Sequence, residues 1–175
     1  SRDLNHLPYC SGICCLGSMK HAAYVREQYD DADVDVYYID IRAHDKLEAF
    51  YNRVRADEHI HFIKFKPAAV VVNDDGRPAV CGEDTIGREV YERPYDLVVL
   101  ATGMEPSVAN GYKPALHLEE DDYGFLVPKL EGVGGVFPAG VAGGPKDVSS
   151  SVQSATAAAL RAVQTVSAHG RAAAE

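Results

Sequence analysis

In the first third of the chain, segments whose apolar residues have helical spacing alternate with segments typical of β-strands. Apolar residues recur at helical spacing over Ile13–Tyr29, form a β-rich run over Val34–Ile41, return to helical spacing over Asp45–Asp57 and end in a second β-rich run over Ile60–Phe65. This alternation predicts an α/β fold with right-handed crossover units on a parallel sheet. No strand precedes the first helix, so we expect the first strand of that sheet to lie outside this sequence.

Three short β-rich runs separated by turn formers come next. They are Ala69–Val72, Pro78–Cys81 and Arg88–Glu92, and the turn Asn73–Gly76 joins the first two. Because short consecutive strands joined by tight turns pair antiparallel, we expect a β-meander.

The rest of the chain alternates apolar runs with glycine-rich and proline-rich connections. Asp96–Ala101 is nearly all apolar, which is typical of a strand buried on both faces of a parallel sheet. Gly103–Gly132, which includes the acidic patch Glu119–Asp122, shows no strong period and predicts a loop. The last predicted elements are a short strand Val136–Ala139, a turn Gly140–Pro145, an Ala-rich helix Val148–Val166 and a frayed end Ala168–Glu175.

Composition narrows the class of protein. The chain has 175 residues, of which 46% are hydrophobic and 25% charged, a balance typical of globular proteins. A net charge of -9, without a basic run longer than two residues, argues against a nucleic-acid partner. No apolar run approaches the roughly 20 residues that span a bilayer. Since neither a signal peptide nor an initiator Met is present, we expect a cytoplasmic segment of a longer protein.

Three of the four cysteines gather at the start of the first predicted helix. Cys10, Cys14 and Cys15 are close in sequence, and Cys81 stands alone. Without a signal peptide, such clustering indicates a reduced metal or redox site rather than a disulfide framework. A helix N-terminus favours thiolates, but zinc and cubane clusters usually take a fourth ligand, which the sequence does not show. Packing of Cys14 or Cys15 as a small hydrophobe is an equal alternative.

Two glycine-containing segments could approach a cofactor. Leu100–Gly103 would end a buried strand, and open α/β sheets bind nucleotides at such carboxyl ends. The turn Gly140–Pro145 before a helix N-terminus would form an anion-receptive pocket, with Asp147 available for a hydroxyl. The alternative is that Asp147 or Ser149 caps the helix. The seven histidines show no shared spacing and receive no role.

Four segments carry a family resemblance. They are YCSGICCLGSMKHAAYVREQY, VYYIDIRAHDKLEAFYNRV, DLVVLATGMEP and AGVAGGPKDVSSSVQSATAAA. Together they resemble the A subunit of heterodisulfide reductase and, within that family, the A subunit of the quinone-interacting membrane-bound oxidoreductase of sulfate reducers. The resemblance covers nearly the whole chain and implies part of an FAD/NAD(P)-binding, thioredoxin-reductase-like fold. It assigns residues 1–95 to the pyridine-nucleotide-like domain and residues 96–175 to the C-terminal return of the FAD domain.

The resemblance also implies cofactor sites. Cys10, Cys14 and Cys15 match three ligands of an iron–sulfur cluster of the 4Fe-4S type, with the fourth ligand upstream of Ser1. The implied flavin-binding residues are Ala101, Thr102, Gly103, Gly140, Gly144, Pro145, Lys146, Asp147 and Val148. The dipole of the helix that begins near Val148 would stabilise reduced, anionic flavin.

Two departures from the family pattern limit what this chain can bind. The G-x-G-x-x-G motif that holds the FAD pyrophosphate is absent, so we expect the chain alone to bind FAD weakly or not at all. The cysteine group stands where a second glycine-rich loop would lead, so we expect no NAD(P) site.

The resemblance implies a subunit that relays electrons between FAD and iron–sulfur centres in a heterodisulfide-reductase-like or quinone-linked complex. No residue here is expected to transfer a proton as a catalyst. The expected partners are iron–sulfur and membrane subunits, through which the chain would lie at the cytoplasmic face of a membrane, and a homodimer could cover an exposed sheet edge. The alternatives are a pyridine-nucleotide thiol–disulfide oxidoreductase that uses Cys10 and Cys14, a cofactor-free docking scaffold, and a structural zinc site.

Overall fold

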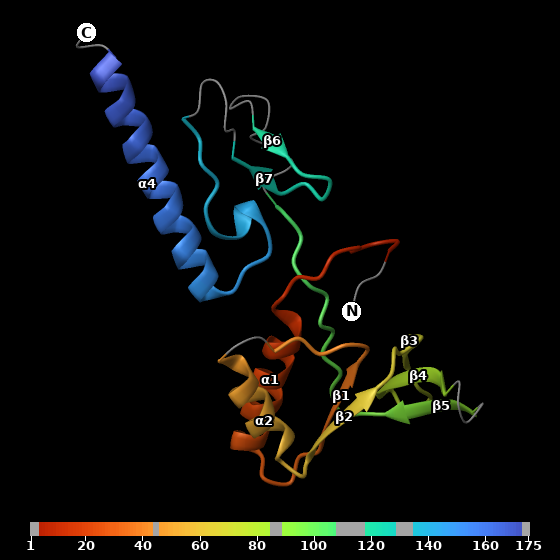
Figure 1. The fold of residues 1–175 in the computed structure, drawn as a ribbon. Helices are drawn as coiled ribbons and strands as arrows, with labels where there is room; N and C mark the ends of the chain where they lie inside the picture. Colours follow the sequence, from red (N-terminus) through yellow and green to blue (C-terminus); the bar gives the residue numbers. More distant parts are fainter. Residues whose placement is uncertain (1–3, 44–45, 85–88, 108–117, 129–134, 173–175) are drawn as a thin grey trace. The chain divides into compact units, whose positions relative to one another are not determined.

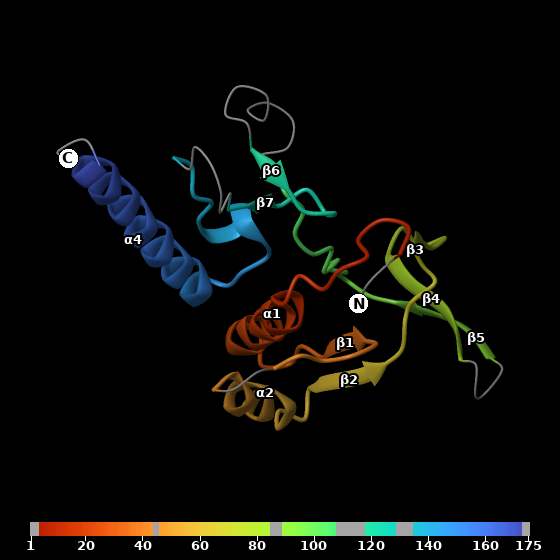
Figure 2. The same ribbon diagram turned by 45° about the horizontal axis from the view of Figure 1, so that its top comes forward.

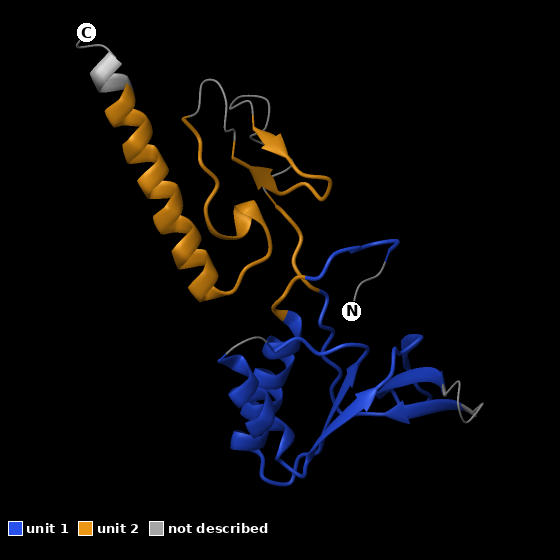
Figure 3. Ribbon diagram, viewed as in Figure 1, with its two compact units in different colours: residues 1–10, 14–102 blue, residues 11–13, 103–175 orange. Residues whose placement is uncertain are grey.

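The chain forms two compact units, shown in different colours in Figure 3. One consists of Ser1–Cys10 and Cys14–Thr102, and the other of Ser11–Ile13 and Gly103–Glu175. The structure, a computed structural model, describes residues 4–43, 46–84, 89–107, 118–128 and 135–172. The predicted domain boundary between residues 95 and 96 stays a prediction.

The first unit opens with a helix–strand–helix–strand sequence, as predicted (Figure 1). The elements are α1 (Cys14–Gln28), β1 (Val34–Tyr38), α2 (Leu47–Arg55) and β2 (Ile60–Lys64). β1 and β2 pair in parallel, with Val34 opposite Ile60. Parallel strands require a crossover connection, which α2 supplies here. The start of the second predicted helix at Asp45 lies outside the described residues.

The core of this unit lies where the two helices meet the parallel strands. Its buried side chains are Met19 and Ala22 of α1, Val54 of α2 and Ile60 of β2. The ring of Phe62 in β2 packs edge-on against Tyr51 of α2, with the ring centroids 5.9 Å apart. Cys15, Leu16 and Ala23 of α1 are partly buried against this cluster, so the face of α1 that carries them packs on the core.

The predicted meander is confirmed. β3 (Ala69–Val72), β4 (Pro78–Asp84) and β5 (Glu89–Pro94) form an antiparallel sheet with β4 in the middle (Figure 2). Asn73 builds the first turn, because its Oδ1 accepts hydrogen bonds from the backbone N–H groups of Asp75 and Arg77. Gly76 completes the turn at φ +77°, a conformation that favours glycine. Arg88, the predicted start of the third strand, lies outside the described residues.

The predicted strand Asp96–Ala101 is wrong for this chain. No strand of the described residues pairs with it, and Leu97, Val99 and Leu100 are 73%, 66% and 66% exposed. An apolar run can form a doubly buried strand only where neighbouring strands and covering helices exist. The short strand predicted at Val136–Ala139 is absent for the same reason, although the backbone of Ala139 is extended.

The second unit contains a small hairpin that the sequence did not predict. β6 (Glu119–Glu120) and β7 (Leu126–Val127) pair antiparallel within the region expected to be a loop. The carboxylate of Asp121 accepts hydrogen bonds from the N–H groups of Tyr123 and Phe125, which closes the turn. The side chain of Phe125 is buried beneath it. The side chain of Asp121 therefore stabilises this turn. The hydrophobic pattern of the segment shows no strand period, so the sequence carried no signal for the hairpin.

A glycine turn and a long helix complete the second unit. The turn is the short 3₁₀ helix η2 (Gly140–Gly143), and α4 spans Val148–Ala172. The helix therefore runs beyond Val166, and the fraying predicted from Ala168 is wrong as far as Ala172. No helix of the described residues is both long and apolar enough to cross a membrane. The mixture of helices with parallel and antiparallel sheets confirms the α/β class, while the FAD-binding fold stays a prediction.

Substitution of Gly82 by Ala should destabilise the meander. A Cβ at this position would overlap Cζ of Phe65, whose ring is held against Tyr91 at a centroid distance of 5.0 Å. Because a Cβ would push this ring away from Tyr91, we expect Gly82→Ala to lower the free energy of unfolding by about 1–3 kcal/mol, measured by urea denaturation.

Gly17→Ala is the matched control. Nothing lies within 4 Å of a Cβ at Gly17, which is inside α1. Alanine should therefore stabilise the helix by about 0.5–1 kcal/mol. Equal responses of the two variants would contradict the steric explanation.

Candidate functional site

The three clustered cysteines lie at the start of α1 and in the loop before it. Cys14 and Cys15 are the first two residues of the helix, and Cys10 is exposed in the preceding segment. All four cysteines of the chain are thiols rather than disulfides. The structure therefore places two of the expected ligands at the positive end of a helix dipole, which favours thiolates.

Cys14 and Cys15 share one open pocket of about 50 Å³. Its lining residues are Cys14, Cys15, Ser18, Met19, Val36, Tyr37, Tyr38, Asp40, Ile41 and Ala101. The pocket is far smaller than the roughly 300–1,000 Å³ of a site for a drug-sized ligand. Ala101, which the resemblance assigns to the flavin, is among the residues that line this pocket.

Cys15 has a structural role that Cys14 does not show. Its side chain packs against the core cluster that contains Met19, and its Sγ donates a weak hydrogen bond to the carbonyl oxygen of Asp40 at 3.7 Å. The donated hydrogen would have to leave before Cys15 could act as a metal ligand. The partly buried packing of Cys15 against the core is what the interpretation of a cysteine as a small hydrophobe predicts.

The thiols fit an iron–sulfur cluster in chemistry but are not gathered around one centre. Thiolate sulfur is the donor that such clusters use. Among the described residues, no group of three or more His, Cys, Asp or Glu side chains is arranged to hold a metal ion. Cys10 does not line the pocket of Cys14 and Cys15. The structure thus brings together two of the three expected ligands.

The glycine turn of the second unit closes on the first turns of α4. Gly140 adopts φ +59° and Gly144 φ +132°, and the N–H of Gly140 donates to Oγ of Ser154 at 3.2 Å. Nζ of Lys146 lies 3.5 Å from the carbonyl oxygen of Gly144. The turn needs glycine at these positions because of their positive φ angles. It lies against Ser151 and Ser154 of α4.

Asp147 caps α4. Its Oδ1 accepts the N–H of Ser150 at 2.7 Å, and its carbonyl oxygen accepts the N–H of Ser151. The hydrogen bonds from Ser150 hold the pKa of the Asp147 carboxyl below its usual value. The predicted alternative of a helix cap is therefore confirmed for Asp147, while Val148 next to it is exposed.

The expected flavin residues fall in both units. Ala101 and Thr102 belong to the first, and Gly103 and the segment from Gly140 to Val148 belong to the second. Gly103 adopts φ +95°, which explains the glycine at this position. A flavin site that both groups share stays a prediction.

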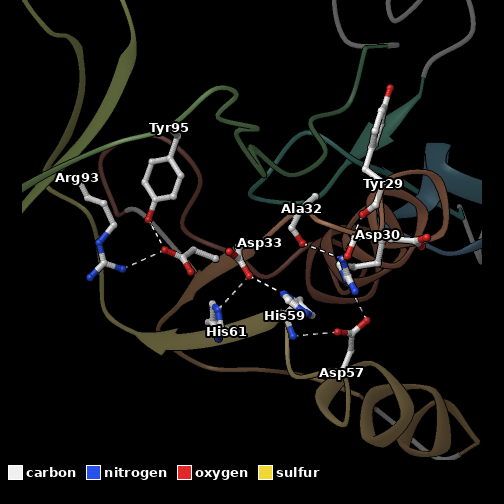
Figure 4. A network of polar contacts seen from close by, with 11 residues as sticks. Tyr29, Asp30, Ala32, Asp33, Asp57, His59, His61, Arg93 and Tyr95 are labelled. Atoms are coloured by element: carbon white, nitrogen blue, oxygen red, sulfur yellow. Dashed lines mark hydrogen bonds and ion pairs between the residues drawn. The ribbon is translucent and has the colours of Figure 1, made fainter.

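A polar network that the sequence did not reveal joins α1 to both parallel strands (Figure 4). Nη1 of Arg26 donates to the carbonyl oxygens of Tyr29, Asp30 and Ala32, at 3.1, 2.6 and 3.0 Å. Nε of the same guanidinium donates to Asp57 at 3.3 Å. One cation therefore holds the turn between α1 and β1 and links it to the loop between α2 and β2.

Two histidines complete this end of the network. Nδ1 of His59 is 2.8 Å from Oδ1 of Asp33, and Nε2 of His61 is 3.8 Å from the same oxygen. His61 lies on β2 and His59 directly precedes it, so their spacing of two residues allows both side chains to reach the same carboxylate. The sequence predicted no role for either histidine.

A second cluster ties β1 to the end of the meander. The hydroxyl of Tyr95 donates to the carboxylate of Asp35, and Nη1 of Arg93 donates to the same group at 3.0 Å (Figure 4). The hydroxyls of Tyr95 and Tyr37 are 2.7 Å apart. Burial, followed by the hydrogen bond to Asp35, raises the pKa of Tyr95, so the phenol stays protonated. The cluster satisfies a carboxylate that is only 11% exposed.

Comparison with known proteins finds relatives along almost the whole chain. It is 39% identical over 179 aligned residues to an iron–sulfur A subunit of CoB–CoM heterodisulfide reductase, the one numbered 2, of Methanopyrus kandleri. It is 42% identical over 164 residues to the A subunit of the H2:CoB–CoM heterodisulfide, ferredoxin reductase of Methanothermobacter marburgensis. The A subunit of a ferredoxin- and F420H2-dependent CoB–CoM heterodisulfide reductase of Methanosarcina acetivorans is 39% identical over 165 residues.

The alignments differ in how much of each protein they cover. They include 96%, 89% and 89% of this chain, but only 27%, 25% and 21% of the respective relatives. The chain thus spans about a quarter of the length of the proteins it matches. No family model matches it.

The stability of the first unit should depend on pH through Asp57. The N–H of His59 and the guanidinium of Arg26 lower the pKa of this carboxyl below its ordinary 3.8. The stabilisation is therefore complete above the ordinary pKa and is lost as the pH falls through the lowered one. Asp57→Asn, which has no proton to gain, should lose less stability on acidification, measured as urea midpoints between pH 7 and pH 2.

Asp74→Asn serves as the control, because it makes the same change at an exposed turn residue. It should follow the acid dependence of the unsubstituted chain. Superimposable curves for Asp57→Asn and the unsubstituted chain would refute the assignment.

Loss of the cap should weaken α4. Asp147→Ala removes the acceptor of the Ser150 N–H, whereas Asp147→Asn keeps an oxygen in the same place. We expect Ala, and not Asn, to reduce the helical circular dichroism and the thermal midpoint. If Ala leaves both unchanged, Asp147 does not stabilise the helix.

Proposed function

From the premise that the chain belongs to the family of heterodisulfide reductase A subunits, we propose that it forms part of an electron-transfer flavoprotein subunit. The subunit would relay electrons between FAD and iron–sulfur centres. The observation that carries this proposal is the cysteine pair at the N-terminus of α1, in a chain aligned with a protein named an iron–sulfur subunit. The resemblance to the A subunit of the quinone-interacting membrane-bound oxidoreductase, which the sequence motifs suggest, is likewise part of this proposal.

Cys10, Cys14 and Cys15 are the proposed thiolate ligands of a 4Fe-4S cluster. Such a cluster supplies one-electron redox chemistry when bound. The N-terminus of α1 would favour the charged form of Cys14 and Cys15. Binding would require Cys15 to release its proton and its hydrogen bond to Asp40. It would also require Cys10 to approach the pocket, with a fourth ligand from outside these three residues.

The flavin would use the glycine turn and the start of α4. The proposed residues are Ala101, Thr102, Gly103, Gly140, Gly144, Pro145, Lys146, Asp147 and Val148. The glycines with positive φ allow a close approach of the backbone, and the N-terminus of α4 favours negative charge. Asp147 already serves as the cap, so its contribution would come through the orientation of the helix end. The chain by itself should hold FAD weakly or not at all, and NAD(P) is not part of the proposal.

The proposed partners are iron–sulfur and membrane subunits of the parent complex. Through them the chain would lie at the cytoplasmic face of a membrane. The excess of acidic over basic side chains speaks against nucleic acid as a partner.

Reconstitution of cysteine variants tests the ligand set. The chain, Cys14→Ser and Cys81→Ser would each be incubated anaerobically with iron, sulfide and excess dithiothreitol, whose thiol can occupy a fourth position. We expect the chain and Cys81→Ser to retain iron and acid-labile sulfide with a broad visible absorption, and Cys14→Ser to lose most of both. Cys81 is the matched control because it lies on β4, away from the α1 thiols in sequence and element.

The other outcomes separate the alternatives. Equal iron in all three proteins would refute Cys14 as a ligand. Zinc without iron would support a structural zinc site. A Cys10–Cys14 disulfide without metal would support thiol–disulfide chemistry, and neither metal nor disulfide would favour a docking scaffold.

A further inference from the structure

One hydrogen bond holds the loop between Cys10 and Cys14 to a segment much later in the chain. The hydroxyl oxygen of Ser11 accepts the backbone N–H of Met104 at 2.9 Å, across a separation of 93 residues. The two partners belong to the same compact unit, and Ser11 is only 4% exposed. Loss of a buried acceptor is costly, because the donor then loses this hydrogen bond without gaining one to water. Ser11 is therefore a fixed point next to Cys10.

A glycine with positive φ stands beside each partner of this bond. Gly12 follows Ser11 and has φ +71°, and Gly103 precedes Met104 and has φ +95°. Among the described residues, nothing lies within 4 Å of a Cβ at Gly12, so close packing does not explain this glycine. The backbone turn explains it, because side chains other than glycine rarely adopt this conformation. The turn is thus part of how the loop reaches Met104.

The anchor limits how far Cys10 can move from the thiols of α1. Consecutive Cα atoms are 3.8 Å apart, so Cys10 can turn about Ser11 but cannot leave it. At the other end of the loop, α1 begins at Cys14, and Met19 of the same helix is buried in the core. The loop is therefore held at both ends. Such order reduces the conformational entropy that remains to be lost when a ligand gathers the thiols.

The same bond links the two segments that the proposed cofactors would use. Ser11 directly follows Cys10, a proposed ligand of the cluster, and Met104 directly follows Gly103, a proposed flavin residue. We propose that Ser11 is a positioning residue of the cysteine site, whose hydrogen bond to Met104 keeps Cys10 within reach of Cys14. The inference rests on the proposed function where it concerns the cluster, but the order of the loop can be measured without metal.

The equilibrium of a Cys10–Cys14 disulfide in glutathione buffers measures the order of the loop in the metal-free chain. Cys15→Ser together with Cys81→Ser leaves these two thiols alone. In this background Ser11→Ala should lower the effective concentration of one thiol at the other by about two- to tenfold, the range expected for the loss of one hydrogen bond. It should also speed the exchange of the Met104 amide hydrogen, followed by NMR, since that amide loses its acceptor.

Two further variants separate the role of the hydroxyl from a general effect of substitution. Ser11→Thr keeps a hydroxyl on the same carbon and should restore both the disulfide equilibrium and the slow exchange of Met104. Ser154→Ala is the matched control, because it removes a serine hydroxyl that accepts the N–H of Gly140 at 3.2 Å, far from the cysteines in sequence. It should leave both measurements unchanged.

Reconstitution with iron and sulfide relates the loop to the cluster. With all four cysteines present, Ser11→Ala should lose iron to a chelator about two- to tenfold faster than the unsubstituted chain, and Ser11→Thr should lose it at the unsubstituted rate. If the unsubstituted chain retains no iron, the proposed cluster fails, and the disulfide equilibrium alone decides the role of Ser11. An unchanged disulfide equilibrium, an unchanged exchange of Met104, or iron that Ser11→Ala releases no faster would each overturn the proposal.

Discussion

The packing of α1 on the parallel pair of β1 and β2 is the interaction on which the first unit depends. Met19 and Ala22 of α1 are buried with Val54 and Ile60, and the same contact brings Cys14 and Cys15 beside the end of β1. Hydrophobic burial is not directional, so it does not by itself fix how the helix lies. Arg26 supplies direction, because its guanidinium binds three carbonyl oxygens and Asp57 at once. The thiol pocket thus lies at the start of a helix that the packed core and the several hydrogen bonds of one guanidinium hold in place.

The two candidate cofactor sites are formed by different kinds of contact. The thiol pocket is built from α1, β1 and Ala101, which are distant in sequence, so it exists only in the folded unit. The glycine turn and the cap at Asp147 are made by residues close in sequence, and backbone conformation with short-range hydrogen bonds defines them. The proposed cluster would require the pocket to rearrange, since Cys15 donates to Asp40. The proposed flavin contact would use a helix end that is already formed.

Exposed apolar residues mark positions at which further strands or helices could pack against the chain. The run at Leu97, Val99 and Leu100 has the composition of a buried strand without neighbours. The relatives are about four times as long as the aligned segment, so in them further chain is available to supply such neighbours.

The sequence by itself determined the elements whose signal is local. The helical periods of α1 and α2, the β-rich runs of β1 and β2 and the turn at Asn73 were all readable, because side-chain spacing and turn chemistry act within a few residues. The family was readable too, since its motifs are short and ordered. Only the tertiary structure decided that Asp96–Ala101 has no strand partner among the described residues, that Cys14 and Cys15 share a pocket without Cys10, and that Asp33 meets His59 and His61. These outcomes depend on contacts between distant parts of the chain, because a strand needs a partner and a pocket needs walls that no single segment supplies.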